Sequence, residues 1–358
     1  MPARLDIASG REKLNVLRGG DLCTIIKDMW ISGIFGTQLF KFKLDVKYMA
    51  EKYLSSKKIG KITLDMSAYN GTDEYSDGDV ENDILAYCKK DCINEALLND
   101  TRWPVFYHLS PIRENLLNWF PFKNNASALE IGMGCGAVTG VLCRNIATVE
   151  GVEISVRRAE IAAWRHKDCA NLTIHVGNLN DMKINKKFDY VTLIGVLEYA
   201  GSFTHTDSPY QNFLQACRKY LKPDGKLLIA IENKFGLKYW SGAREDHTGK
   251  LFDGITGYQG NKKVKTFSKP ELTKLLHNSG YDNLEWYYPF PDYKLPNKIY
   301  SDDHLPKAGE FKDNHFVYYD MDRYALFNEA HAMNEIATSE LFDIFSNSFL
   351  VCCSNGEK

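Results

Sequence analysis

Between residues 126 and 290, short apolar runs alternate with helix-like stretches, and this rhythm restricts the fold strongly. Strand-like runs lie at residues 127–132, 148–154, 172–178, 188–195, 225–233 and 284–290, with a last one at 348–353. Helical patterns lie between them at residues 155–168, 210–221 and 268–280. Such alternation predicts an α/β protein with a doubly wound sheet and helices on both of its faces.

A glycine-rich turn follows the first of these strands. Gly132, Gly134 and Gly136 alternate along the stretch, and Glu130 precedes them on the strand. Glycines at these positions allow a sharp turn and let a ligand approach the main chain closely. A helix expected from about Ala137 then directs its free amide groups toward that ligand. A tight turn without any ligand is the alternative that these residues alone leave open.

The glycine spacing and the following strands help to choose between cofactors. A nicotinamide enzyme prefers its third glycine after a gap of two residues, whereas these glycines alternate throughout. Glu153 ends the second strand about twenty residues later, where a carboxylate can accept hydrogen bonds from ribose hydroxyls. The pattern therefore disfavours an NAD-dependent oxidoreductase, which stays as an alternative.

Composition and charge exclude several classes of function. The chain of 358 residues has a formal net charge of -2, so it offers no overall attraction to nucleic acid or anionic lipid. Neither a signal-peptide core nor an apolar run of membrane-spanning length is found in the sequence. We therefore expect a cytoplasmic protein without an integral membrane segment or a nucleic-acid partner. The nine cysteines lack zinc-ribbon spacing, so reduced thiols are expected.

With these motifs in order, residues 126–288 resemble the class I S-adenosylmethionine-dependent methyltransferases. The resemblance implies a Rossmann-like sheet of about seven strands, with S-adenosyl-L-methionine as the cofactor. Glu153 is similar to the acidic ribose ligand of the family, whereas Asn178 stands where the family often has an acid that meets the adenine. The cofactor-binding residues implied in this way are Glu130, Gly132, Gly134, Gly136, Glu153, Ile154, Asn178, Leu179, Gly195, Leu197, Tyr107 and Arg113.

A narrower resemblance concerns residues 103–122, 129–140 and 231–255. These stretches are similar to methyltransferase-like proteins that accompany glycosyltransferases in bacterial surface-polysaccharide pathways. The resemblance implies a sugar hydroxyl as the acceptor, on a glycan, a nucleotide sugar or a lipid-linked intermediate. A glycosyltransferase partner and an oligomer are both compatible with it.

The polar segment after the fifth strand is where acceptor chemistry is expected. A sugar hydroxyl is a poor nucleophile, so a base that removes its proton assists the transfer. His247 is the first candidate, because an unperturbed imidazole titrates near neutral pH. Asp246 and Glu232 are the other catalytic candidates. The substrate-binding candidates are Glu198, Tyr199, Asn233, Tyr239, Trp240 and Arg244.

The same segment also contains side chains that could bind a metal ion. Asp246 and His247 with a further carboxylate have suitable ligand chemistry, but we expect no metal. Upstream, Ser110 is a plausible N-cap before Pro111, and Arg113 is placed by the resemblance against the carboxylate of the cofactor.

The resemblance also divides the chain. Residues 1–101 are expected to form an N-terminal accessory region, with a strand or helix at 24–46, a helix near 46–58 and a strand at 60–66, and residues 102–358 are expected to form the methyltransferase domain. Residues 289–347 are an insertion before the last strand, where the family usually has a hairpin. Two alternatives remain: a non-catalytic cofactor-binding partner of a glycosyltransferase, and an N-methyltransferase, whose usual tetrapeptide is replaced by "GVLEY" after the fourth strand.

Overall fold

The computed structural model describes residues 56–355 apart from residues 74, 183, 205, 261, 262, 313 and 315–322. The element expected at 24–46 lies outside the described residues, as does most of the helix expected near 46–58. Its last three residues, 56–58, belong to a strand and not to a helix. The described residues all belong to one compact unit, Leu54–Lys358.

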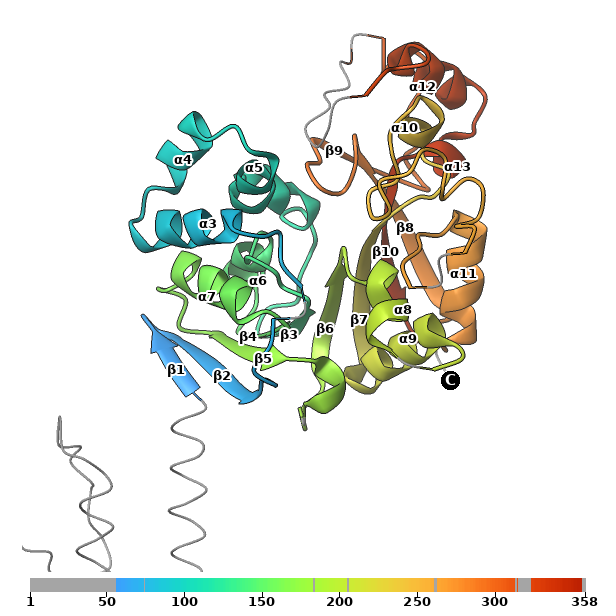
Figure 1. Ribbon diagram of the computed structural model, residues 1–358. Helices are drawn as coiled ribbons and strands as arrows, with labels where there is room; N and C mark the ends of the chain where they lie inside the picture. Colours follow the sequence, from blue (N-terminus) through green and yellow to red (C-terminus); the bar gives the residue numbers. More distant parts are fainter. Residues whose placement is uncertain are drawn as a thin grey trace, which may run out of the picture. The chain divides into compact units, whose positions relative to one another are not determined.

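One ten-stranded sheet forms the centre of this unit (Figure 1). Its strands are β1 (Ser56–Ile59), β2 (Ile62–Ala68), β3 (Ser127–Ile131), β4 (Thr148–Glu153), β5 (Leu172–Gly177), β6 (Phe188–Ile194), β7 (Leu221–Glu232), β8 (Asn283–Phe290), β9 (Lys298–Ser301) and β10 (Ser348–Ser354). They lie in the order β1-β2-β5-β4-β3-β6-β7-β10-β8-β9. The six strands from β2 to β7 run parallel to one another. Strand β1 pairs antiparallel with β2 at one edge, and β10, β8 and β9 pair antiparallel at the other.

Helices and short 3-10 turns connect the strands. They are α3 (Val80–Lys89), α4 (Ile93–Asn99), α5 (Trp103–Leu109), η1 (Pro111–Leu116), α6 (Thr139–Asn145), α7 (Val156–Arg165), η2 (Leu179–Asp181), η3 (Leu197–Tyr199), α8 (Ala200–Phe203), α9 (Pro209–Lys219), α10 (Leu237–Trp240), α11 (Lys269–Asn278), α12 (Glu329–Thr338) and α13 (Phe342–Phe345). Ser110 caps η1 as expected, accepting a hydrogen bond from the amide of Ile112.

Each face of the sheet packs against its own helices. Alternate strand residues such as Leu129 and Val191 join a core with α9, α11 and α12, whereas Ala128 and Tyr190 join a core with η1, α6 and α7. Parallel strands covered on both faces are expected to be apolar throughout, which explains the continuous apolar runs in the sequence. The α/β prediction with helices on both faces is confirmed.

The sheet is wider than the seven strands expected. The hairpin of β1 and β2 extends one edge beside β5, and β9 extends the other edge beside β8. Strands β8 and β10 are antiparallel neighbours although residues 291–347 separate them. None of the helices in the described part of the chain is long and apolar enough to cross a membrane.

Strand order also locates the site. Consecutive connections leave β3 in opposite directions along the sheet, toward β4 and β5 on one side and toward β6 and β7 on the other. Open α/β sheets bind ligands outside the carboxyl ends of their strands at such a reversal. The glycine turn after β3 lies at this position.

Candidate functional site

The glycine turn has the backbone that its sequence predicts. Gly132, Gly134 and Gly136 have φ values of 67°, 56° and 74°, a region that side chains other than glycine rarely adopt. A Cβ atom on Gly132 would lie 2.6 Å from Cγ2 of Val196, whereas one on Gly134 would meet no atom within 4 Å. A Cβ atom on Gly136 would lie 2.9 Å from Nε2 of His166. The turn therefore needs glycine for its conformation at each position, and at Gly132 and Gly136 also for space.

Glu153 connects the end of β4 to the glycine turn. Its two carboxylate oxygens accept hydrogen bonds from the amides of Gly134, at 2.8 Å, and Ser155, at 2.9 Å. A carboxylate offers about four acceptor positions, so lone pairs remain for a ligand. The residue lines the cavity described next and is 4% exposed. Glu153 thus shapes the turn and can still accept hydrogen bonds from ribose hydroxyls.

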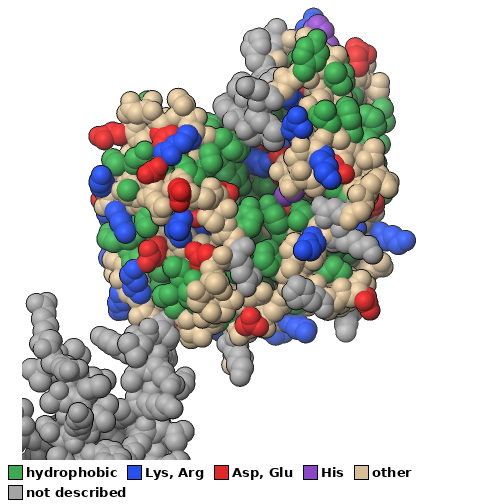
Figure 2. All heavy atoms as spheres, viewed as in Figure 1, with side chains coloured by type: hydrophobic (Ala, Val, Ile, Leu, Met, Phe, Trp, Pro, Cys, Tyr) green, Lys and Arg blue, Asp and Glu red, His purple; other side chains and the backbone are tan. Residues whose placement is uncertain are grey.

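A cavity of about 360 Å³ lies at the carboxyl ends of the parallel strands. Figure 2 shows the molecule hollowed there, between the lobe that carries α3 and α5 and the lobe that carries α10 and α12, with apolar side chains along the hollow. Of the candidates from the sequence, it is lined by Glu130, Gly132, Gly134, Glu153, Ile154, Asn178, Leu179, Gly195, Tyr107, Arg113, Glu198, Tyr199, Glu232, Asp246 and His247. Residues from seven separate parts of the chain therefore meet in one cavity.

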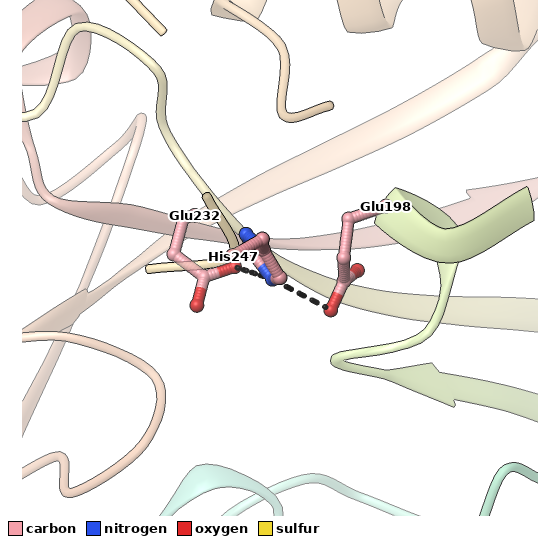
Figure 3. Close-up of side chains that lie close together, drawn as sticks. All are labelled: Glu198, Glu232 and His247. Carbon is pink, nitrogen blue, oxygen red and sulfur yellow. Dashed lines mark ion pairs between the residues drawn. The ribbon is translucent and has the colours of Figure 1, made fainter. Parts of the chain in front are cut away.

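At one end of the cavity, three acidic side chains surround His247. Its Nδ1 lies 3.0 Å from a carboxylate oxygen of Glu245, and its Nε2 lies 3.6 Å from Glu198 and 4.0 Å from Glu232. Figure 3 shows Glu198 approaching the imidazole from the turn after β6 and Glu232 approaching it from β7. Burial by itself lowers the pKa of His247, but Glu232, Glu198 and Glu245 together raise it well above its usual value. The surrounding carboxylates therefore favour the protonated form of the ring.

Asp246 belongs to a neighbouring ion-pair network. It contacts Lys238 at 3.0 Å and also pairs with Lys294 and the hydroxyl of Tyr239. Burial raises the pKa of Asp246, but the two lysines outweigh it and hold the pKa well below its usual value. Lys294 also lies 3.1 Å from Glu232, so it links this network to the carboxylates around the imidazole.

Six candidates are not among the residues that line the cavity: Gly136, Leu197, Asn233, Tyr239, Trp240 and Arg244. The side chain of Asn233 donates to the carbonyl oxygens of Ile344 and Ser346, which ties β7 to the end of α13. Trp240 is 40% exposed and donates to the carbonyl of Phe235. A role for these residues in ligand binding remains a prediction.

Several cavity residues were not among the candidates. Tyr75, Asp77, His108 and Arg158 line the cavity from the acidic segment before α3, from α5 and from α7. Asp77 accepts hydrogen bonds from both His108 and Arg158, each at 2.6 Å. The signal in the sequence is the acidic run at residues 73–81, in which Asp77 and Glu81 pair with Arg158 on α7.

Two residues of the insertion before the last strand reach the cavity. Tyr293 and Lys294 both lie there, and the hydroxyl of Tyr293 is 3.2 Å from Glu232. Arg113 also lines the cavity, with its guanidinium 4.3 Å from the ring centre of Tyr107. Its Nε is buried without a hydrogen-bond partner, so it is available to an anionic ligand group.

We expect replacement of Glu130 by glutamine to stabilise the free protein at alkaline pH. Burial raises the pKa of Glu130 to about 7, helped by Glu153 and opposed by a hydrogen bond from Thr139. The folded protein therefore keeps a proton that the unfolded chain releases near pH 4.5, so the free energy of unfolding falls as the pH rises from there to about 7. Urea unfolding should show Glu130→Gln more stable by about 2–3 kcal/mol at pH 8.

The same variant supplies its own control at acid pH. Near pH 4, below the pH at which the unfolded chain releases its proton, the carboxyl group is protonated in both the folded and the unfolded states, so the two proteins should have nearly equal stability. An equal difference at both pH values would mean that packing, and not ionisation, causes the effect.

Comparisons with known proteins agree on one family. A family model described as "Methyltransferase domain" matches residues 105–286. The ubiquinone biosynthesis O-methyltransferase of Haemophilus ducreyi is 30% identical over 138 residues, which are 35% of this chain and 54% of that protein. The demethylmenaquinone methyltransferase of Tropheryma whipplei is 32% identical over 101 residues, 28% of this chain and 39% of that protein.

The matched regions are partial. The chain spans about half the length, or less, of these curated relatives. Among solved structures, a possible histamine N-methyltransferase of Thermotoga maritima has 16% identity and a TM-score of 0.42, over 76% of this chain and all of that one.

Proposed function

Because this chain belongs to the methyltransferase-domain family, and is therefore an S-adenosylmethionine-dependent methyltransferase, we propose that it methylates a hydroxyl group of a carbohydrate acceptor. The observation that carries this proposal is the buried group of Glu198, Glu232 and His247 at one end of the cofactor cavity. Unpartnered carboxylate oxygens of this kind suit an acceptor that donates hydrogen bonds.

The chain offers groups that fit both ends of the cofactor. Glu153 has acceptor positions left for the ribose hydroxyls, and the unpartnered Nε of Arg113 suits the carboxylate of the methionine part. Asn178 lines the same cavity, with its side-chain oxygen already accepting from the amide of Asn180 at 3.0 Å. When bound, S-adenosylmethionine supplies an electrophilic methyl group on a sulfonium.

The protein has to hold the acceptor oxygen in line with that methyl group and exclude water. Glu232 has one oxygen near Lys294 and Tyr293, whereas its other oxygen is buried without a hydrogen-bond partner. That free oxygen is placed to receive the hydroxyl proton as the carbon–oxygen bond forms. His247, fixed through Nδ1 by Glu245, then orients the hydroxyl or takes the proton after losing its own.

Two acceptor classes share this hydroxyl chemistry. The narrower resemblance to polysaccharide-associated methyltransferases supports a sugar hydroxyl and a glycosyltransferase partner. The relative named as a ubiquinone biosynthesis O-methyltransferase favours a phenol-like ring hydroxyl as the second candidate. The polar end of the cavity, with Lys294, Glu198 and Glu232, favours the sugar.

Calorimetric titration with S-adenosylhomocysteine tests the cofactor first. We expect micromolar binding that Glu153→Ala abolishes and that Glu160→Gln, a carboxylate change on α7 outside the cavity lining, retains. Circular dichroism must confirm that the Glu153 variant is folded, because this side chain also holds the amide of Gly134. A folded wild-type protein that does not bind S-adenosylhomocysteine would contradict the proposal.

Release of S-adenosylhomocysteine with sugar, catechol and amine acceptors then tests the reaction. Turnover with nucleotide sugars or glycosides supports the proposal. Turnover with catechols alone favours the second candidate, whereas turnover with amines alone contradicts hydroxyl methylation.

A further inference from the structure

Glu198, Glu232 and His247 come from three segments and meet at one point. Glu198 follows β6 on η3, Glu232 ends β7, and His247 lies in the loop after α10. One donor atom from each lies within 4.8 Å of the other two. In Figure 3 both carboxylates approach the same imidazole edge. We call these three residues the Glu–Glu–His cluster.

The cluster has unused ligand capacity. Glu198 and Glu232 are 1% and 0% exposed, and each has one carboxylate oxygen, Oε2, without a hydrogen-bond partner. Lys294 and Tyr293 approach the other oxygen of Glu232. Two buried carboxylates side by side are costly unless a cation or hydrogen-bond donors compensate them.

The histidine is held in the orientation typical of a metal ligand. Glu245 lies 3.0 Å from Nδ1, which leaves Nε2 facing the two glutamates at 3.6 and 4.0 Å. A carboxylate behind one ring nitrogen, with the other nitrogen directed at a metal, is a common arrangement around metal-binding histidines. Ligand atoms about 2.1 Å from a shared ion lie about 3.4 Å apart in a tetrahedral set. Small side-chain rotations would bring the cluster to that spacing.

From this geometry we infer that the Glu–Glu–His cluster binds one divalent transition-metal ion beside the methyl donor and that this ion holds the acceptor hydroxyl. The inference departs from our expectation of no metal, and it rests on the proposed function for its role in catalysis. With the ion bound, Glu232 and His247 are ligands of the ion and do not themselves contact the acceptor hydroxyl. Asp246, the acid first considered as a ligand, is instead paired with Lys238 and Lys294.

The ligand types restrict which metal ions fit. Two carboxylates suit Mn²⁺ and similar hard ions, whereas an imidazole favours Fe²⁺, Co²⁺ or Zn²⁺ over Mg²⁺ and Ca²⁺. Three protein ligands leave coordination positions open for a substrate oxygen. We therefore expect Mn²⁺, Co²⁺ or Zn²⁺ to bind and Ca²⁺ to bind much more weakly.

An ion at this place would assist the transfer as a Lewis acid. Coordination lowers the pKa of the acceptor hydroxyl, whose proton leaves to a carboxylate or to water. An electron pair on that oxygen forms the new carbon–oxygen bond while the carbon–sulfur bond breaks and its electrons return to sulfur. The products are a methyl ether, S-adenosylhomocysteine and one proton.

Titration of the chelator-treated full chain with Mn²⁺, followed by the loss of the free-ion EPR signal, tests the site directly. We expect one Mn²⁺ per chain, with affinity at least about tenfold weaker in Glu198→Gln and in His247→Asn. Asp253→Asn is the matched control, because Asp253 is also buried with an unpartnered oxygen but does not belong to the cluster. Its affinity for Mn²⁺ should equal that of the wild type.

Parallel titrations with S-adenosylhomocysteine separate the two proposals. A wild-type chain that binds S-adenosylhomocysteine but not Mn²⁺ overturns the metal site and leaves the methyltransferase intact. Binding of Mn²⁺ that the cluster variants do not weaken also overturns it. If a cluster variant fails to fold, two measurements on the wild-type protein decide: the number of Mn²⁺ ions bound per chain and their displacement by Zn²⁺. Failure of Zn²⁺ to displace Mn²⁺ from one site per chain contradicts the inference.

Discussion

Replacing Arg158 with glutamine is expected to lower the free energy of unfolding by about 3–5 kcal/mol. The guanidinium donates to Glu81 at 2.8 Å and to Asp77 at 2.6 Å, and it lies 4.4 Å from the ring centre of Tyr75. Glu81 is completely buried, so losing Arg158 leaves an uncompensated charge inside the protein. Urea unfolding at neutral pH measures the effect.

The neighbouring arginine provides the matched control. Arg157 is on the same helix but is more exposed, and it donates to the carbonyl of Gly78 at 3.3 Å. Arg157→Gln should therefore change the stability by less than about 0.5 kcal/mol. Equal losses in the two variants would show that the ion pairs of Arg158 contribute nothing specific.

Two alanine substitutions in the glycine turn are expected to have separate effects. In Gly132→Ala, a methyl group would approach Val196 in a backbone region unfavourable to alanine, so we expect about 2–4 kcal/mol of destabilisation. Gly134→Ala meets no protein atom within 4 Å, so its loss of stability should be only about 1 kcal/mol, from the backbone conformation.

Cofactor affinity should rank these two variants in the opposite way. Gly134 lines the cavity, and the space around its added methyl group is free of protein atoms. A bound cofactor would compete for that space, so S-adenosylhomocysteine should bind at least about tenfold more weakly to folded Gly134→Ala, a change of about 1.4 kcal/mol. Unchanged affinity in this variant would place the cofactor elsewhere in the cavity. Thermal unfolding and calorimetry on the same samples separate the two effects.

The sheet and the glycine turn could be predicted because their signals are local. Each parallel strand reads as a short apolar run, and the positive φ of Gly132 and Gly134 requires glycine in the sequence. Glu153 was found in the same way, from its place at the end of the second strand. Strand β2 was predicted from the run at residues 60–66, whereas β1 and β9 are four residues long and carry no comparable apolar run.

The electrostatics of the site depend on partners that are distant in sequence. Arg158 meets Asp77 81 residues away, and Lys294, which lies in the insertion, meets Glu232 at the end of β7. The sequence suggested His247 as a group that titrates near neutral pH, but three carboxylates that surround it in space raise its pKa. Pairings of this kind depend on the tertiary fold, which no residue spacing encodes.

The attachment of the acidic segment to α7 has a consequence for ligand binding. Asp73 accepts hydrogen bonds from Ser155 and from the amide of Val156, directly after Glu153, and Asp77 lines the cavity. A ligand at Glu153 and this segment therefore act on the same first turn of α7. Thermodynamic reciprocity requires that, if the ligand tightens the attachment of the segment, the attached segment tightens the ligand by the same factor. The stretch before α3 would then regulate cofactor retention, and its amide hydrogen exchange would report occupancy of the cavity.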